Sequence, residues 1–163
     1  MIYFLSRKGD YCMKKELLRN VNVFKDLKEG ELKVFSKIVT SEKYKDGEII
    51  IEEGGEGDSL YIVEEGVVLV SKLEGEIRAE IVTLSRGEQF GEMSLLEDAR
   101  TSARVSAKGD VKLLRISRDD FTRVLSANDA LSAKVYHALA LSLSRRLRHT
   151  SDDLVTWKPS FEF

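Results

Sequence analysis

The segment FGEMSLLEDARTSARV, residues 90–105, carries the residues whose types and spacing best fit a binding chemistry. Gly91 precedes the short apolar run EMSLL, which can form one helical turn. The first turn of a helix presents backbone N–H groups to an anion, and the small Ser94 would let a phosphate approach. Glu92 is an acceptor without a donor of its own, which suits a sugar hydroxyl. The segment therefore favours a nucleotide ligand; the alternative is that FGE only makes a turn and LL fills the core.

The rest of the sequence argues against an enzyme. The two histidines, His137 and His149, lie twelve residues apart and lack the spacing of metal ligands. No Ser-His-acid arrangement can be placed. The acidic pairs Glu52-Glu53 and Glu64-Glu65 flank turn glycines, which is typical of solvated strand ends. We therefore expect no catalytic residues and no metal site.

Composition sets limits on location and partners. The net charge of −2 over 163 residues provides no strong field toward nucleic acid or an anionic membrane. Cys12 is the only cysteine, which fits a reducing compartment, so we expect a cytoplasmic protein. No apolar run approaches the roughly 18 residues that a membrane helix needs.

The elements that must position the binding segment change in type twice along the chain. Residues 14–40 repeat apolar positions at spacings of three and four, which predicts short helices. Residues 44–117 contain short extended runs separated by glycine turns, which predicts strands of a sandwich or barrel. From residue 118 to 150 helix returns: Ser117 and Asp120 form a capping-box pattern, and Asn128 or Asp129 begins a longer helix. We expect one domain over residues 14–150, with an N-terminal arm (1–13) and a C-terminal tail (151–163).

Two longer motifs carry a resemblance to a known family. The run GGEGDSLYIVEEG has glycine, aspartate, tyrosine and valine at Gly54, Gly57, Asp58, Tyr61, Val63 and Gly66. The run LSRGEQFGEMSLL contributes Leu84, Gly87, Phe90, Gly91, Glu92, Ser94, Leu95 and Leu96. With both motifs in order, the chain resembles the cyclic nucleotide-binding domain family, the module of catabolite activator protein and of protein kinase A regulatory subunits. The resemblance implies an α+β fold: a jelly-roll-like antiparallel β-roll of about eight strands, flanked by short N-terminal helices and two C-terminal helices.

The resemblance also implies a ligand, cAMP or cGMP, and a site. Glu92 would take the ribose 2′-hydroxyl, and the backbone of Gly91, Glu92, Met93 and Ser94 would meet the cyclic phosphate. The family's phosphate-binding arginine is in doubt. A gapless match puts Arg100 on a proline position, Thr101 on the arginine position and Ser102 on a small residue. Arg100 could serve if the loop is one residue shorter than usual; otherwise Thr101 offers only a hydroxyl. Arg104 falls in a variable position and is expected to point outward.

Two functions remain open. One is a stand-alone regulatory sensor of cAMP or cGMP that signals through its C-terminal helices. The alternative is a degenerate domain that acts as a dimerisation or protein-interaction module without nucleotide. We expect a homodimer through the helix 128–149, because Ala130, Ala133, Ala138 and Ala140 would allow two helices to approach closely. No DNA-binding domain is expected after this helix, so the output would come from an unknown downstream protein.

Overall fold

The structure is a computed structural model, which describes residues 13–97 and 99–156 and, beyond residue 149, the backbone only. Residues 13–20 are helical. The elements that follow are α2 (Glu29–Ile38), β1 (Thr40–Tyr44), β2 (Ile49–Ile51), β3 (Ser59–Glu74), β4 (Ile77–Leu84), β5 (Gln89–Phe90), α3 (Glu92–Leu96), β6 (Arg104–Ser117), α4 (Arg118–Ser126) and α5 (Asp129–Thr156).

The strands form one antiparallel sheet in the order β1-β6-β3-β4, with β2 paired to β6 and β5 to β3. The α+β class with an antiparallel sheet and flanking helices is confirmed. The described residues contain six strands, fewer than the eight or so expected, because two predicted turns lie inside long strands. Gly66 and Gly109 have φ angles of 87° and 80° and bend β3 and β6 without ending their pairing.

The sequence also misplaced the start of the sheet. Residues 14–40 were expected to be helical and the strands to begin at Tyr44, but α2 ends at Ile38 and β1 begins at Thr40. The β-branched residues Val39 and Thr40 favour an extended backbone, and β1 pairs along its whole length with β6. The predicted strand over residues 77–84 is confirmed as β4.

Two apolar clusters hold the fold, one on each face of the central strands. Leu60 and Ile62 of β3 face the helices, where they join an outer cluster that includes Phe35 and Leu139. Their neighbours Tyr61 and Val63 point into the roll, because side chains alternate along a strand. The inner cluster includes the rings of Tyr61 and Phe90, whose centroids are 5.2 Å apart. The inner and outer packing together fix the position of Phe90, two residues before Glu92.

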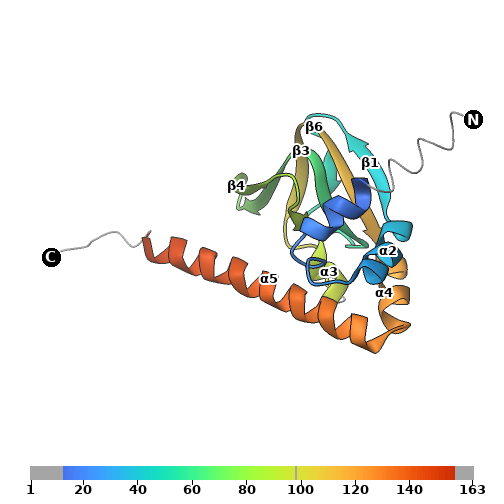
Figure 1. The fold of residues 1–163 in the computed structure, drawn as a ribbon. Helices are drawn as coiled ribbons and strands as arrows, with labels where there is room; N and C mark the ends of the chain where they lie inside the picture. The colour runs from blue at the N-terminus through green and yellow to red at the C-terminus, as the bar shows by residue number, and fades with distance from the viewer. Residues whose placement is uncertain (1–12, 98, 157–163) are drawn as a thin grey trace, which may run out of the picture.

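The C-terminal helices begin at the predicted caps. The backbone N–H of Asp120 donates to Ser117 Oγ at 3.2 Å, and that of Leu131 donates to Asn128 Oδ1 at 3.0 Å. α5 runs under α3 and continues to Thr156, past residue 150 at which we expected the domain to end (Figure 1). No described helix is both long enough and apolar enough to cross a membrane.

Candidate functional site

The short helix α3 begins at a glycine that no other residue could replace without strain. Gly91 has a φ of 85°, and a Cβ there would lie 2.4 Å from the carbonyl oxygen of Ser59. This close approach seats α3 against the start of β3. The predicted helical turn over EMSLL is confirmed as α3.

Glu92, the first residue of α3, is a buried carboxylate with one partner. It is 1% exposed, and its Oε1 forms an ion pair with Arg146 Nη1 of α5. Its Oε2 is also buried and has no hydrogen-bond partner among the described residues. Burial raises the pKa of Glu92, and the positive charge of Arg146 opposes this rise. A hydroxyl donor would satisfy Oε2, which is the chemistry that the sequence predicts for this residue.

Arg146 joins α5 to the site and was not identified from the sequence. Its Nη2 also donates to the carbonyl oxygen of Gln89, the residue that begins β5. Basic residues are common near a helix C-terminus because they offset the helix dipole, so the basic run at residues 145–149 did not single out Arg146. Helical periodicity could have identified Arg146. It follows the buried residues Val135, Leu139 and Ser142 at spacings of eleven, seven and four, so it lies on the face of α5 that packs against the roll.

A tight turn over residues 54–58 packs against Ser94 of α3. Gly57 approaches Ser94 so closely that a Cβ on Gly57 would lie 2.0 Å from Ser94 Oγ and 3.2 Å from Thr101 Cγ2. Arg118, the first residue of α4, donates to the carbonyl oxygens of both Gly57 and Ser94. The turn, α3 and the start of α4 are therefore held as one unit.

Thr101 and Arg100 lie in different surroundings. Thr101 is 8% exposed, its Oγ1 accepts from the N–H of Gly55 at 2.9 Å, and the same hydroxyl donates to the carbonyl of Glu52. Two backbone hydrogen bonds, Gly54 N to Thr101 O and Thr101 N to Gly55 O, complete the contact. Arg100 is exposed and its Nη1 donates to the carbonyl oxygen of Gly54 at 2.9 Å. Thr101 thus packs against the turn, and Arg100 lies outside it.

The structure brings together four of the seven residues predicted for the site: Gly91, Glu92, Ser94 and Thr101. The other three, Met93, Arg100 and Ser102, are exposed. Arg100 lines an outer cavity of about 580 Å³ together with Glu56, Asp58, Arg115 and Arg118, where acidic and basic side chains are mixed. Arg104 pairs with Glu52 at 2.7 Å.

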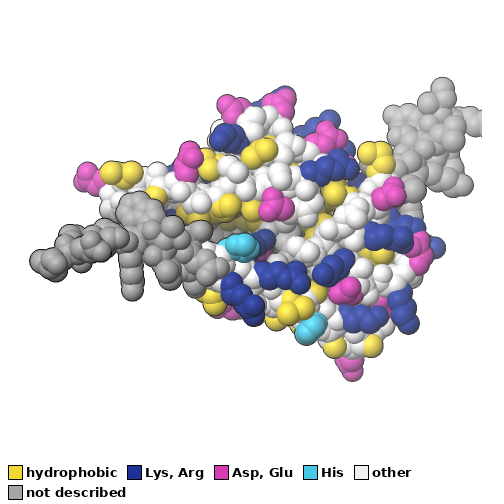
Figure 2. Space-filling model, turned by 60° about the vertical axis from the view of Figure 1, so that its left-hand side comes forward, with side chains coloured by type: hydrophobic (Ala, Val, Ile, Leu, Met, Phe, Trp, Pro, Cys, Tyr) yellow, Lys and Arg dark blue, Asp and Glu magenta, His cyan; other side chains and the backbone are white. Residues whose placement is uncertain are grey.

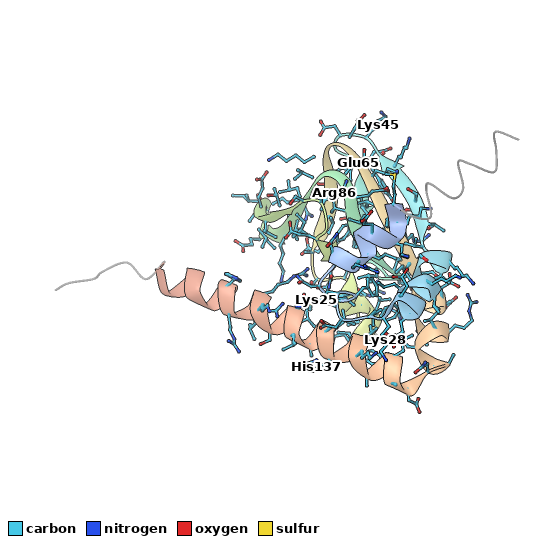
Figure 3. The ribbon with its side chains drawn as sticks, viewed as in Figure 1. Lys25, Lys28, Lys45, Glu65, Arg86 and His137 are labelled. Carbon is cyan, nitrogen blue, oxygen red and sulfur yellow. The ribbon has the colours of Figure 1, made fainter. Side chains whose placement is uncertain are left out.

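Other titratable groups lie apart from this site. His137 projects from the side of α5 that faces away from the roll, and Lys45, Glu65 and Arg86 lie at the far end of the roll (Figure 3). Among residues 13–97 and 99–149, no three His, Cys, Asp or Glu side chains are grouped to hold a metal ion.

Comparisons with known proteins agree with the motifs. Residues 41–128 match the family model described as cyclic nucleotide-binding domain. The chain is 33% identical to a cAMP-dependent protein kinase regulatory subunit of Mucor circinelloides over 78% of its length and 30% of that protein. It is 33% identical to cGMP-dependent protein kinase 2 of Mus musculus over 90% of its length and 20% of that protein. It thus spans less than a third of either relative.

A solved structure extends the likeness to the fold. The regulatory subunit of a cAMP-independent protein kinase A from Trypanosoma cruzi, bound to guanosine, superposes with a TM-score of 0.70 and 27% identity. The match covers 81% of this chain and 45% of that one. These similarities, the family-model match above all, agree with the roll and the α3 geometry: the chain belongs to the cyclic nucleotide-binding domain family.

Proposed function

We propose that this chain is a regulatory module that binds a ribose-containing ligand in its roll and passes the binding event to α5. The observation that carries the proposal is the second oxygen of Glu92. It is a buried acceptor with no partner among the described residues, at the position where the family motif places a ribose contact. Buried polar atoms rarely lack a partner, and a ribose hydroxyl supplies the donor.

The ligands that the sequence predicts are cAMP and cGMP. The two relatives support this class, since one is a cAMP-dependent regulatory subunit and the other a cGMP-dependent kinase. In the proposed arrangement, Glu92 accepts from the ribose, and the phosphate end lies near the backbone of Gly91, Met93 and Ser94. Arg100 would join them only after leaving the carbonyl of Gly54. The guanosine bound to the Trypanosoma cruzi neighbour supports a wider class, a ribose with its base.

The proposed signal passes through Arg146. The carboxylate that would meet the ligand is the one that ties the C-terminal half of α5 to the roll. A hydroxyl bound to Glu92 changes the charge distribution and the position of that carboxylate, so the ligand interacts differently with the docked and undocked states of α5. Such a difference in interaction is what a ligand needs to shift a conformational equilibrium.

A regulatory role needs a partner that reads α5. The outer side of its C-terminal half exposes Arg145, Arg148 and His149, and Figure 2 shows Lys and Arg side chains, dark blue, beside both cyan histidines. This charge supports a downstream protein with an acidic surface. We propose a regulatory and not a catalytic role, in the cytoplasm, in keeping with the lone Cys12.

The test is a calorimetric titration of the full chain with cAMP, cGMP, adenosine and guanosine, followed by hydrogen exchange of α5 at saturating ligand. We expect at least one ligand to bind and to change exchange in the segment around Arg146. Glu92→Gln keeps the shape but removes the charge, and it should weaken binding about ten- to a hundredfold. No binding of any of the four at millimolar concentration would refute the proposal.

The second candidate is a homodimerisation or interaction module. Ala133, Tyr136 and Ala140 are exposed on α5 at spacings of three and four, and Ala130 is exposed as well, which favours contact with a second helix. Ala138 is buried within its own chain, at 8% exposure, and would not contribute. Sedimentation of the chain and of Ala140→Glu separates the candidates, because a dimer that depends on α5 would dissociate in the variant whether or not nucleotide binds.

A further inference from the structure

The side of the site opposite Glu92 holds a hydroxyl where the family motif has a cation. We infer that the roll of this chain prefers an uncharged nucleoside to the corresponding cyclic nucleotide. The inference rests on the proposed function, a ribose ligand at Glu92, and names the class of that ligand. Three features carry it: the bonds of Thr101, the engagement of the nearby arginines, and the open end of the roll's inner face.

The hydroxyl of Thr101 is already hydrogen-bonded within the protein. Its hydroxyl both accepts from Gly55 N–H and donates to the carbonyl of Glu52, and the side chain is 8% exposed. Its methyl group lies next to Gly57, since a Cβ built on Gly57 would be 3.2 Å from it. Thr101 therefore holds the segment before β6 against the turn over residues 54–58, and it offers no charge to a ligand.

Three of the arginines around the site are directed elsewhere. Arg100 donates to Gly54 O on the outer side of the turn, and Arg104 pairs with Glu52 at 2.7 Å. Arg118 donates to the carbonyl oxygens of Gly57 and Ser94. Arg146, the cation at the site itself, is already paired with Glu92. A cyclic phosphate would bring a second negative charge beside that pair, and burying an anion without a cation of its own is strongly unfavourable.

The uncharged parts of a nucleoside fit what remains. Glu92 Oε2 needs one hydroxyl donor, and the ribose diol provides it without adding charge. The base would find an apolar surface where β4 pairs with β3. Val82 pairs with Val70, which packs against the inner cluster of the roll, yet Val82 is 48% exposed. The inner face is therefore open at this point, and a planar base would cover it.

The test compares pairs of ligands that differ only in the phosphate. Calorimetric titrations of the full chain with adenosine against cAMP, and guanosine against cGMP, should give a nucleoside affinity at least about tenfold higher in one pair. Thr101→Arg restores a cation at the phosphate end and should raise cyclic-nucleotide affinity about ten- to a hundredfold. Thr122→Arg, which adds the same charge at an exposed position of α4, is the control and should leave the preference unchanged.

The outcomes separate this inference from the proposed function. If cAMP or cGMP binds more tightly than its nucleoside, the inference is wrong while the ribose-sensor proposal stands. Loss of that affinity in Arg100→Ala would then identify Arg100 as the phosphate ligand. If none of the four ligands binds, both proposals fail. The wild-type comparison decides the matter even if Thr101→Arg does not fold.

Discussion

Arg146 and Glu92, which are 54 residues apart in the chain, form an ion pair that connects the last helix to the centre of the binding motif. One partner is 2% exposed at its side chain and the other 43%. Glu92 is therefore held in a site from which water is excluded. Its partner Arg146, on α5, is partly exposed to solvent.

Removing Arg146 should loosen α5. The pair lies between surface ion pairs, which contribute up to about 1 kcal/mol, and buried ones, whose disruption costs about 3–5 kcal/mol. We expect Arg146→Ala to lower the free energy of unfolding by about 1–2 kcal/mol and to speed amide exchange around residue 146. Arg145→Ala, on the exposed side of the same turn, is the matched control. Equal effects of the two substitutions would mean that the pair does not hold the helix.

Glu92 should give stability a defined pH dependence. Its pKa in the folded chain is raised above the ordinary value of 4.5 by burial, with Arg146 opposing. The unfolded chain thus loses this proton at a lower pH than the folded chain. The contribution of Glu92 is fully present below its unfolded pKa and is lost as pH rises through the folded pKa.

The measurement is urea denaturation of the wild type and Glu92→Gln at several pH values between 4 and 8. Because glutamine cannot ionise, the unfolding free energy of the wild type minus that of the variant should fall as pH rises. A difference that grows with pH would show that Arg146 outweighs burial and that the folded-state pKa is lowered.

Gly57 should tolerate no side chain while Ser94 is present. A Cβ on Gly57 would lie 2.0 Å from Ser94 Oγ and 2.1 Å from Ser94 Cβ, so Gly57→Ala forces α3 away from the turn. We expect a loss of about 1–3 kcal/mol, as for overpacked cores. Removing the opposing side chain, in Gly57→Ala with Ser94→Gly, should recover part of it. Gly30→Ala is the control: nothing lies within 4 Å of a Cβ there, and in helix α2 the change should stabilise by about 0.4–1 kcal/mol.

Thr101 should matter to stability through its hydroxyl. Thr101→Val keeps the shape but removes the acceptor for Gly55 N–H and the donor to Glu52 O. Gly55 N–H keeps a 3.2 Å bond to Glu52 O, so we expect a loss of only about 1–2 kcal/mol. Thr101→Ser should stay close to the wild type in thermal and urea unfolding. An unchanged stability in Thr101→Val would argue that the hydroxyl contacts are not made in solution.

Local sequence patterns predicted much of this fold. The cap at Ser117, the strand over residues 77–84 and the helical turn at Glu92 each depend on neighbouring residues, and each is confirmed. The continuity of β3 and β6 was missed because a glycine at positive φ can either end a strand or bend it. Which of the two occurs depends on pairing with a distant strand, here Val67 with Lys108.

The residues of the site likewise divide into those that a local motif predicts and those that depend on long-range contacts. Glu92 and Gly91 were found because the motif that carries them is contiguous. Arg146 was missed because its contact depends on the angle at which α5 crosses the roll, which no local pattern encodes. The packing of Thr101 against the turn depends on hydrogen bonds between residues 52–55 and residue 101, which are again distant in the chain.

α5 has a mechanical consequence for any event at Glu92. Its 28 residues make a rod about 42 Å long, and a tilt of about 10° at its start would swing the far end by on the order of 7 Å. A tilt of α5 that is too small to disturb the roll would thus displace Thr156 by on the order of 7 Å. Arg146 lies partway along α5, and its contacts with Glu92 and Gln89 hold the helix against the roll.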